Sequence, residues 1–354
     1  MSCDRGHDVT ALVNAHAGGG DSKEVVDGVC VVRRKPWVTV SNQPVAPRLF
    51  DGIDLSNFDL VHFHAPNPFA NALLLPLLAR AKVRPALVIT HHMDIRGRLG
   101  LREMSRALYA RLVRAAQLVI VTSIKNANLS RDLPKTETML AVPLGVEPEH
   151  YVLNAEGKAR AAAWRKDLAG DAPLIGFLGR HARYKGLDVL VRAIAQMPGV
   201  HAAIAGDGPY RQSAEALAAK LGVADRIHFL GKVDHGTKLS LLSSIDVYTF
   251  PSTEITEAFG ISQLEAMFCG APVVASALPT GVTDVSIDGR TALTCRPSDA
   301  ADLAEKVQTL LNDRVLAERL AQSARAHVMA SMTSAAIEAQ TRNAIEAAMI
   351  KGLV

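Results

Sequence analysis

The sequence predicts an α/β fold built from two doubly wound domains. Short apolar runs rich in β-branched residues alternate with longer helical patterns, which is typical of strand-helix-strand units on a parallel sheet. The chain has 354 residues, more than one typical domain, and 49% of them are hydrophobic, enough for two large cores. We therefore expect two Rossmann-like sheets that face each other across a cleft, where such sheets bind ligands at the carboxyl ends of their strands.

Each half of the chain contains five segments expected to be strands. Those of the first half are 8–14, 28–34, 59–64, 86–90 and 118–122. Those of the second half are 173–179, 201–206, 226–231, 246–251 and 271–276. The polar, turn-rich segment 145–172 separates the halves, which predicts a first domain over 1–160 and a second over 161–330. The stretch 315–350 is expected to be helical throughout, and we expect 331–354 to pack back toward the first domain.

Composition and charge exclude several classes of protein. The net charge of +4 is too small to indicate nucleic-acid binding by itself. Four cysteines, at positions 3, 30, 269 and 295, lack the short spacing of zinc or redox motifs, which favours free thiols in the cytoplasm. The most apolar stretch, 69–81, is shorter than the ~20 residues that a membrane span needs. No signal peptide or membrane-crossing helix is expected.

Two loops after expected strands of the second half could bind phosphate. The loop "RHARYKG" places Arg180 and Lys185 at the carboxyl end of a strand, where together they could neutralise a diphosphate. An ordinary basic loop is the alternative reading. The loop "AGDGP" (205–209) would allow close backbone approach to a ligand, although a tight turn explains it equally well.

In the first half, the strand 86–90 ends in "HHMDI", so His91 or His92 lies at a sheet edge near Asp94. Such a histidine could be a base, a hydrogen-bond donor or, with a third ligand that is not evident, a metal ligand. A purely structural histidine remains the alternative.

The segment 96–114 holds six Arg and one Glu, a local charge of +5. On a helix, Arg98, Arg102 and Arg106 form one stripe and apolar residues form another, so this helix could lie on an anionic membrane surface. A solvated face with a core face behind it is the alternative reading.

The stretch "PSTEITEAFGISQLEAMFC" (251–269) places Glu257 in a loop and Glu265 within a helix that starts near Gly260. The backbone N–H groups of Phe259, Gly260 and Ile261 would be free helix-start donors, suited to phosphate. Carboxylates on either side of an anion site would bind hydroxyl groups at both ends of a diphosphate. This arrangement matches a nucleotide sugar, in which the diphosphate joins a sugar to a ribose.

These residues resemble glycosyltransferase family 4, the retaining nucleotide-sugar glycosyltransferases with the GT-B fold. The resemblance rests on the two glutamates separated by seven residues, on "GFLGRHARYKGLDVLVRA", "AIAGDGP", "RIHFLGKVDHGTKLSLLSSIDVYTFPS" and "VPLGVEPEHY", and it covers about 8–330. The segments "VHFHAPNP" and "HHMDI" are most similar to members that build bacterial surface polysaccharide or lipopolysaccharide.

The resemblance implies a role for each matching residue. Glu257 would bind hydroxyls of the donor sugar, and Glu265 would hold the ribose. Arg180 and Lys185 would stabilise the diphosphate leaving group, and His92 would contact the sugar or the reacting centre. The backbone of Phe259, Gly260 and Ile261 would lie near the sugar and phosphates, and Val233 near the base.

The implied reaction transfers a sugar to a lipid-linked or polysaccharide acceptor, with no metal or other cofactor. It would take place in the cytoplasm, peripherally on the inner face of the membrane. The family's opening strand, glycine-rich loop and helix have no match before "RGHDVTALVN", so we expect a first domain without them. A reading frame started too late, or a truncated protein that binds a nucleotide sugar or a partner without turnover, would explain this. An epimerase or phosphorylase of the same architecture fits less well.

Overall fold

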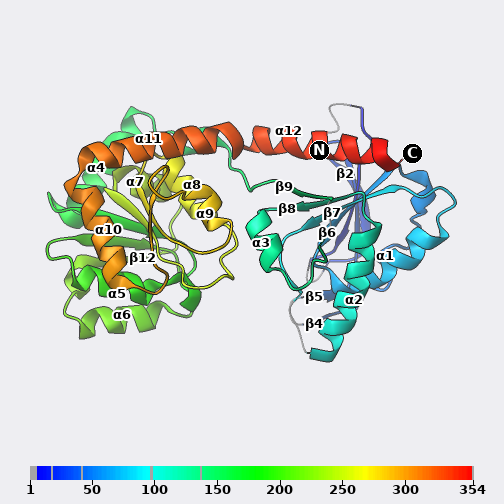
Figure 1. Ribbon diagram of the computed structural model, residues 1–354, viewed down its shortest axis with the longest axis horizontal. Coiled ribbons are helices and arrows are strands. Elements are labelled where there is room, and N and C mark those ends of the chain that lie inside the picture. The colour runs from blue at the N-terminus through cyan, green and yellow to red at the C-terminus, as the bar shows by residue number, and fades with distance from the viewer. Residues whose placement is uncertain (1–5, 17–18, 41–42, 96–98, 136–137, 353–354) are drawn as a thin grey trace. The chain divides into compact units, whose positions relative to one another are not determined.

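The computed structural model describes residues 6–16, 19–40, 43–95, 99–135 and 138–352. The chain divides into two compact units, each with its own sheets and core. The first unit consists of Met1–Val142 together with Glu338–Val354, and the second of Pro143–Ile337 (Figure 1).

The second unit is built on one six-stranded parallel sheet with the order β12-β11-β10-β13-β14-β15. The strands are β10 (Leu174–Leu178), β11 (His201–Ala205), β12 (Ile227–Gly231), β13 (Val247–Phe250), β14 (Val273–Ser276) and β15 (Leu293–Cys295). The chain runs outward from β10 to β12, returns to β13 on the other side of β10, and runs outward again. The strand order thus reverses between β10 and β13, the position at which doubly wound sheets bind ligands.

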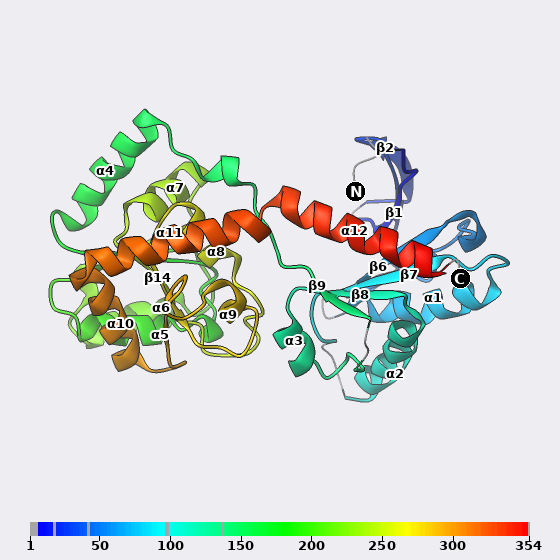
Figure 2. The same cartoon turned by 45° about the horizontal axis from the view of Figure 1, so that its top comes forward.

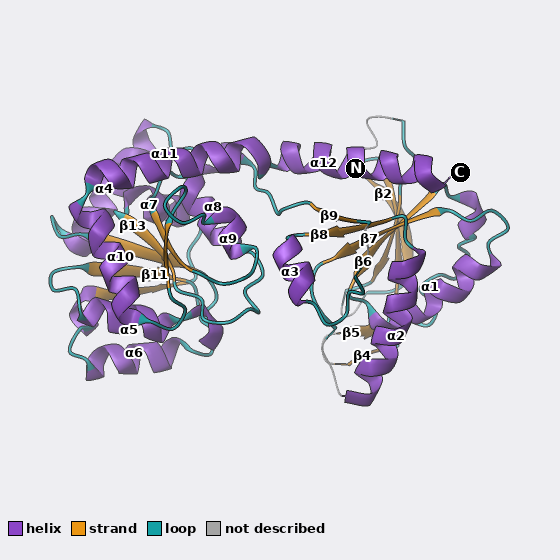
Figure 3. Cartoon of the chain, viewed as in Figure 1, coloured by secondary structure: helices purple, strands orange, loops and turns teal. Residues whose placement is uncertain are grey.

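Helices cover both faces of this sheet (Figure 3). They are α4 (Ala155–Ala169), α5 (Leu187–Ala195), α6 (Arg211–Lys220), α7 (His235–Ser244), α8 (Ile261–Phe268), α9 (Val282–Val285), α10 (Ala300–Asn312) and α11 (Arg314–Ser331). In α5, Leu187, Leu190 and Ile194 recur at helical spacing and are fully buried. This apolar stripe packs with α6 and α10 in one core, and α7 and α8 supply the core on the opposite face.

The first unit contains a four-stranded parallel sheet, β6-β7-β8-β9, and a separate three-stranded sheet, β1-β3-β2 (Figure 2). The strands, with those of a short hairpin, are β1 (Thr10–Asn14), β2 (Ser22–Val26), β3 (Val29–Arg34), β4 (Val38–Val40), β5 (Gln43–Val45), β6 (Leu60–Ala65), β7 (Ala86–His91), β8 (Leu118–Val121) and β9 (Met139–Ala141). The helices are α1 (Pro68–Arg80), α2 (Leu99–Ala115), α3 (Ile124–Leu129) and part of α12 (Ser334–Gly352). Tyr109 and Leu112 of α2 are buried in the core beneath the four-stranded sheet.

All ten strands expected from the sequence are present. The strands that the sequence did not indicate are β2, β4, β5, β9 and β15. Four of these have only three residues, and β2 is exposed along its whole length, so no burial pattern marks it. In the described residues, β1 pairs only with β3 and β6 only with β7.

Two boundaries differ from those expected. The division between the units falls at 142/143 rather than at 160, because α4 packs on α7 and the short helix η3 (Pro148–Tyr151) packs on α8. The stretch 315–350 is not one helix, because α11 ends at Ser331 and α12 begins at Ser334. Between them, the hydroxyl of Thr333 accepts a hydrogen bond from the amide of Ala336 at 3.1 Å and so caps the new helix.

Candidate active site

Two loops meet at the carboxyl edge of the second unit's sheet, where the strand order reverses. One follows β10 and ends at Gly186, and the other follows β13 and begins at Pro251. The amide of Thr253 donates to the carbonyl of Tyr184 at 2.8 Å. Gly186 has φ +70°, and a Cβ there would lie 2.0 Å from the Pro251 carbonyl oxygen. Only glycine allows this approach, so the contact fixes the two loops against each other.

Lys185 and Glu257, which come from these two loops, form an ion pair. The Lys185 Nζ lies 2.5 Å from Glu257 Oε2, and the two side chains are 12% and 8% exposed. Ser252 donates to the same carboxylate oxygen at 2.9 Å. The Lys185 Nζ also lies 5.2 Å from the centre of the Phe250 ring, within the range of a cation–π contact. The fold therefore joins two residues that the sequence nominated separately, and it holds their charges in a largely desolvated position.

Arg180 is exposed in the loop after β10. Its side chain is available to an anion at this edge, whereas the Lys185 ammonium is already partnered by Glu257. The loop therefore presents two exposed cations, Arg180 and Arg183, and one largely buried cation, Lys185.

Helix α8 begins at the same edge. Gly260 is its N-cap residue, has φ +80°, and carries no capping side chain. A Cβ on Gly260 would lie 2.3 Å from the Phe250 ring, so the position requires glycine for both backbone and space. Phe259 is buried and anchors the turn, whereas Ile261 is 45% exposed. Uncapped N–H groups at a helix start attract anions, so the turn is suited to phosphate.

Glu265 lies one turn into α8 and is already partnered by two side chains. Tyr151 and Lys238 each contact its Oε1 atom, both at 2.7 Å. Burial, and then the neighbouring carboxylate, raise the pKa of the Tyr151 phenol above its ordinary value. Val233 is half-buried after β12 and packs against the core that α8 joins. Glu265 and Val233 therefore belong to the same face of the sheet.

The loop after β10 contains a buried histidine. His181 has no exposed surface, and neither of its ring nitrogens has a hydrogen-bond partner in the described residues. Burial, and then the charge of Arg211, lower the pKa of His181. Gly208, in the loop 205–209, has φ +157°, and a Cβ there would lie 2.5 Å from the His181 carbonyl oxygen. The loop "AGDGP" is thus a tight turn that packs against the loop carrying Arg180.

The two adjacent histidines of the first unit have different environments. His91 is buried, with its Nδ1 2.9 Å from the Tyr109 hydroxyl, and is a core residue. His92 is exposed, with its Nε2 3.1 Å from Nδ1 of His64. Partial desolvation of its ring, followed by the neighbouring His64, lowers the pKa of His92. Of the two rings, that of His92 is the more accessible to solvent.

His62 lies beside this pair, and its Nε2 is 2.7 Å from the Thr90 hydroxyl. Burial, then the charges of His64 and His92, lower the pKa of His62 to about 4. The imidazoles of His62, His64 and His92 are therefore predominantly neutral near pH 7.

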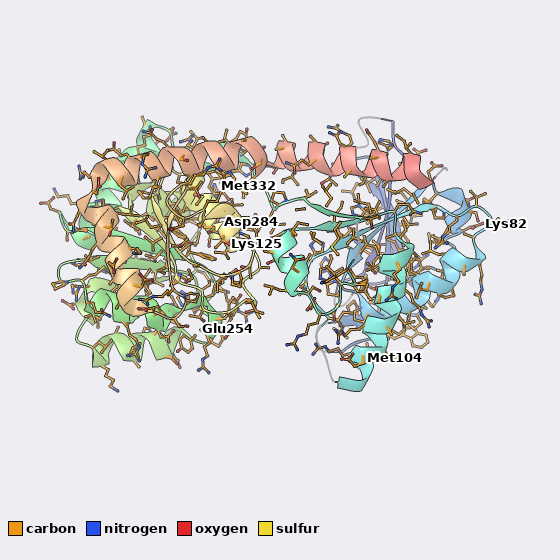
Figure 4. The ribbon with its side chains drawn as sticks, in the orientation of Figure 1. Lys82, Met104, Lys125, Glu254, Asp284 and Met332 are labelled. Carbon is orange, nitrogen blue, oxygen red and sulfur yellow. The ribbon has the colours of Figure 1, made fainter. Side chains whose placement is uncertain are left out.

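Helix α2 carries the basic stripe. Arg98 lies outside the described residues. Arg106 forms ion pairs with Glu103 at 3.0 Å and with Asp132 at 2.7 Å, and the Asp132 side chain has no exposed surface. A shallow surface pocket of about 360 Å³, open to solvent, adjoins these three residues. Arg106 therefore has a structural partner, whereas the exposed Met104 (Figure 4) faces solvent on the same helix.

Neither a metal cluster nor a membrane span is found in the part of the chain that the structure describes. Those residues contain no group of three or more His, Cys, Asp or Glu side chains placed to hold a metal ion. None of their helices is both long and apolar enough to cross a bilayer.

Sequence reasoning missed Tyr151, Lys238, Ser252 and His181. Tyr151 and Lys238 contact a residue that is distant in sequence, and His181 is identified only by burial. Ser252 contacts Glu257, five residues away in the same stretch. The contact between Tyr151 and Glu265, for example, spans 114 positions. No local pattern could have revealed the contacts of Tyr151 and Lys238 with Glu265.

Comparison with known proteins gives two family matches that follow one another along the chain. The model of "Glycosyltransferase Family 4" matches residues 3–150, and that of "Glycosyl transferases group 1" matches residues 160–327. The D-rhamnosyltransferase WbpZ of Pseudomonas aeruginosa is 32% identical over 269 residues, which cover 76% of this chain and 68% of that protein. The chain belongs to the glycosyl transferases group 1. It is a glycosyltransferase.

Two further comparisons agree with this assignment. The O-antigen chain mannosyltransferase C of Escherichia coli is 27% identical to this glycosyltransferase over 270 residues, which cover 76% of this chain and 70% of that protein. The crystal structure of Anabaena Alr3699/HepE in complex with UDP matches with a TM-score of 0.74 and 23% identity, covering 90% and 86% of the two chains. That likeness shows the fold, which is GT-B. The Lys185–Glu257 pair of this glycosyltransferase lies in the part of the chain matched by the group 1 model.

Proposed function

We propose that this glycosyltransferase transfers a sugar from a nucleoside diphosphate sugar to a growing cell-surface glycan. The observation that carries the proposal is the buried ion pair between Lys185 and Glu257, placed at the switch point beside the uncapped start of α8. The names of WbpZ and of the O-antigen mannosyltransferase support a surface glycan as the product. The UDP complex named for the Anabaena structure supports a nucleotide donor.

The proposed role of each residue follows from its charge. Glu257 accepts hydrogen bonds from hydroxyls of the donor sugar, and its ion pair with Lys185 holds the carboxylate in place. Arg180, Lys185 and the amides at the start of α8 stabilise negative charge on the diphosphate as it departs. Fixed positive groups in a desolvated site favour the transition state over the ground state, because that charge increases along the reaction.

The transfer is proposed to retain the anomeric configuration. The bond from the anomeric carbon to the diphosphate oxygen breaks, and its electron pair leaves with the phosphate. The acceptor hydroxyl forms the new bond on the same face, and its proton passes to the departing phosphate. NMR of the first product tests this step. The donor's configuration is expected, and the inverted one would contradict retention. The positive charge that stabilises the departing diphosphate is proposed to come from the chain itself, without a bound metal.

The acceptor is proposed to be lipid-linked, at an anionic cytoplasmic membrane surface. Helix α2 supports this with the exposed Arg111 and Arg114, which are three residues apart and so lie on one face of the helix. The half-buried Arg102 lies on a different face, and Arg106 already pairs with acidic side chains. Co-sedimentation with anionic vesicles should weaken as salt rises, because the Debye length shortens. Equal binding to neutral and anionic vesicles would contradict an electrostatic surface.

A thermal-shift screen with UDP-, GDP- and ADP-sugars tests the donor, because a ligand of the native state raises its melting temperature. We expect one donor class to stabilise the wild type and to be turned over with an acceptor extract. Glu257→Gln should lose turnover. Glu254→Gln, an exposed acid in the same loop (Figure 4), is the matched control and should retain it. No shift and no turnover with any donor would refute the proposal.

A further inference from the structure

The carboxylate of Glu265 is held in place by two side chains. Tyr151 OH donates to Glu265 Oε1 at 2.7 Å, and Lys238 Nζ lies 2.7 Å from the same oxygen. The other carboxylate oxygen, Oε2, takes part in neither contact. The Lys238 and Glu265 side chains are 20% and 12% exposed, so solvent screens the pair only in part.

These three residues come from separate elements that meet only in the fold. Tyr151 ends η3, Lys238 lies in α7 and Glu265 lies in α8. The Lys238 ammonium lies 5.1 Å from the centre of the Tyr151 ring, and that ring stacks on Phe268 at 6.1 Å. The Tyr151 hydroxyl is therefore fixed by its ring and cannot turn away from Glu265 without losing these contacts.

The second attachment of η3 is made by α7. The Nε2 atom of His235 lies 3.0 Å from the carbonyl oxygen of His150, and the His235 ring meets the Tyr151 ring edge-on at 6.2 Å. The short helix η3 thus contacts α7 through His235 and Lys238, and α8 through Glu265 and Phe268. The position of Glu265 depends on this segment as well as on its own helix.

We propose that Tyr151 and Lys238 are positioning residues, which orient Glu265 so that it can bind the donor ribose. The inference rests on the proposed function, in which Glu265 binds the ribose hydroxyls. A carboxylate has about four acceptor sites. Two donors directed to Oε1 therefore fix the rotamer and leave Oε2 to accept from a ribose hydroxyl. Because the carboxylate is ordered before the ligand arrives, less freedom is lost on binding.

The arrangement also predicts selectivity for ribose over deoxyribose. A deoxynucleotide lacks the 2′-hydroxyl, so a Glu265 oxygen fixed toward that hydroxyl would lose its partner while partly buried. If Tyr151 or Lys238 is removed, Glu265 can turn to water and selectivity should fall. The opposite case is inhibition, in which Tyr151 and Lys238 compete with the ligand for Glu265 and must be displaced by it. Their removal would then tighten nucleotide binding.

Calorimetric titration of the full chain with UDP, GDP and ADP, and with the matching 2′-deoxynucleoside diphosphates, tests the inference. For whichever base binds, we expect the wild type to prefer the ribonucleotide by about tenfold or more. Tyr151→Phe and Lys238→Met should each weaken ribonucleotide binding about three- to tenfold and leave the deoxynucleotide unchanged. The ratio of the deoxynucleotide Kd to the ribonucleotide Kd should then approach one. Lys238→Arg, which keeps the cation, should restore part of it.

Controls separate positioning from folding. Tyr210→Phe and Lys220→Met make matched chemical changes at positions outside the site, and both should keep the preference. Thermal unfolding of each variant shows whether it is folded. An unchanged preference in Tyr151→Phe and Lys238→Met, or tighter binding in either, would overturn the inference while the wild type still binds. Failure of the wild type to bind all three ribonucleotides would overturn the proposed function and, with it, this inference.

Discussion

The Lys185–Glu257 pair makes a quantitative prediction about the stability of the second unit. Lys185→Met removes the cation but keeps a chain of similar length, so the Glu257 carboxylate stays buried without its partner. At 2.5 Å and an effective dielectric constant near 20, the lost attraction is about 7 kcal/mol, most of which had offset desolvation. Removal of one partner from a fully buried pair costs about 3–5 kcal/mol. Since these side chains are 12% and 8% exposed, we expect a loss of about 2–3 kcal/mol.

The double variant Lys185→Met/Glu257→Gln should recover part of that loss, because it contains no unpaired charge. We expect a coupling energy of about 1–2 kcal/mol from the double-mutant cycle. Urea unfolding followed by Trp164, which packs against the second unit's core, measures each variant. A Trp37→Phe background removes the other tryptophan, which is 74% exposed and belongs to the first unit.

The reasoning would be refuted by either of two results. One is a loss of less than about 0.5 kcal/mol in Lys185→Met, the size of a typical surface substitution. The other is additive behaviour of the double variant within about 0.5 kcal/mol, because residues in contact should couple. Glu254→Gln, in the same loop but exposed, should change the stability little and serves as the control.

Three further predictions concern other positions. Gly260→Ala should lower the free energy of unfolding by about 2 kcal/mol or more in the same urea assay, because it adds a clash with Phe250 to a left-handed backbone. Gly222 has φ +68° but open space around it, so Gly222→Ala should cost only about 1 kcal/mol. The folded pKa of His62 is about 4, below its ordinary 6.5. The calorimetric stability should therefore fall by about 2–3 kcal/mol as the pH drops from 6.5 to 4, because the unfolded chain takes up the proton first. His62→Gln should flatten that slope, and an identical slope would contradict the assignment. Arg106→Gln should destabilise the first unit by about 2 kcal/mol, because it leaves the fully buried Asp132 without its partner. Arg111→Gln, at an exposed position, should not destabilise it. Equal melting temperatures of the two variants would show that the ion pair contributes nothing.

Much of the second unit's fold could be read from the sequence. Its strands are continuous apolar runs because both faces of a parallel sheet are covered, and such runs stand out against the helical spacing between them. The start of α8 was equally visible, because Gly260 marks the backbone change at the end of a loop. Short or exposed strands such as β2 and β15 have no such pattern, and they were missed.

The sequence by itself determined the family, the parallel sheet architecture and the nomination of Arg180, Lys185, Glu257 and Glu265 as site residues. These features depend on local spacing and on residue type, which the linear chain preserves. Only the tertiary structure decided which charges are paired. It joined Lys185 to Glu257 in a desolvated contact and attached Tyr151 and Lys238 to Glu265. Such contacts form between loops and helices whose approach depends on packing, because burial and distance are properties of the folded chain and not of its sequence spacing.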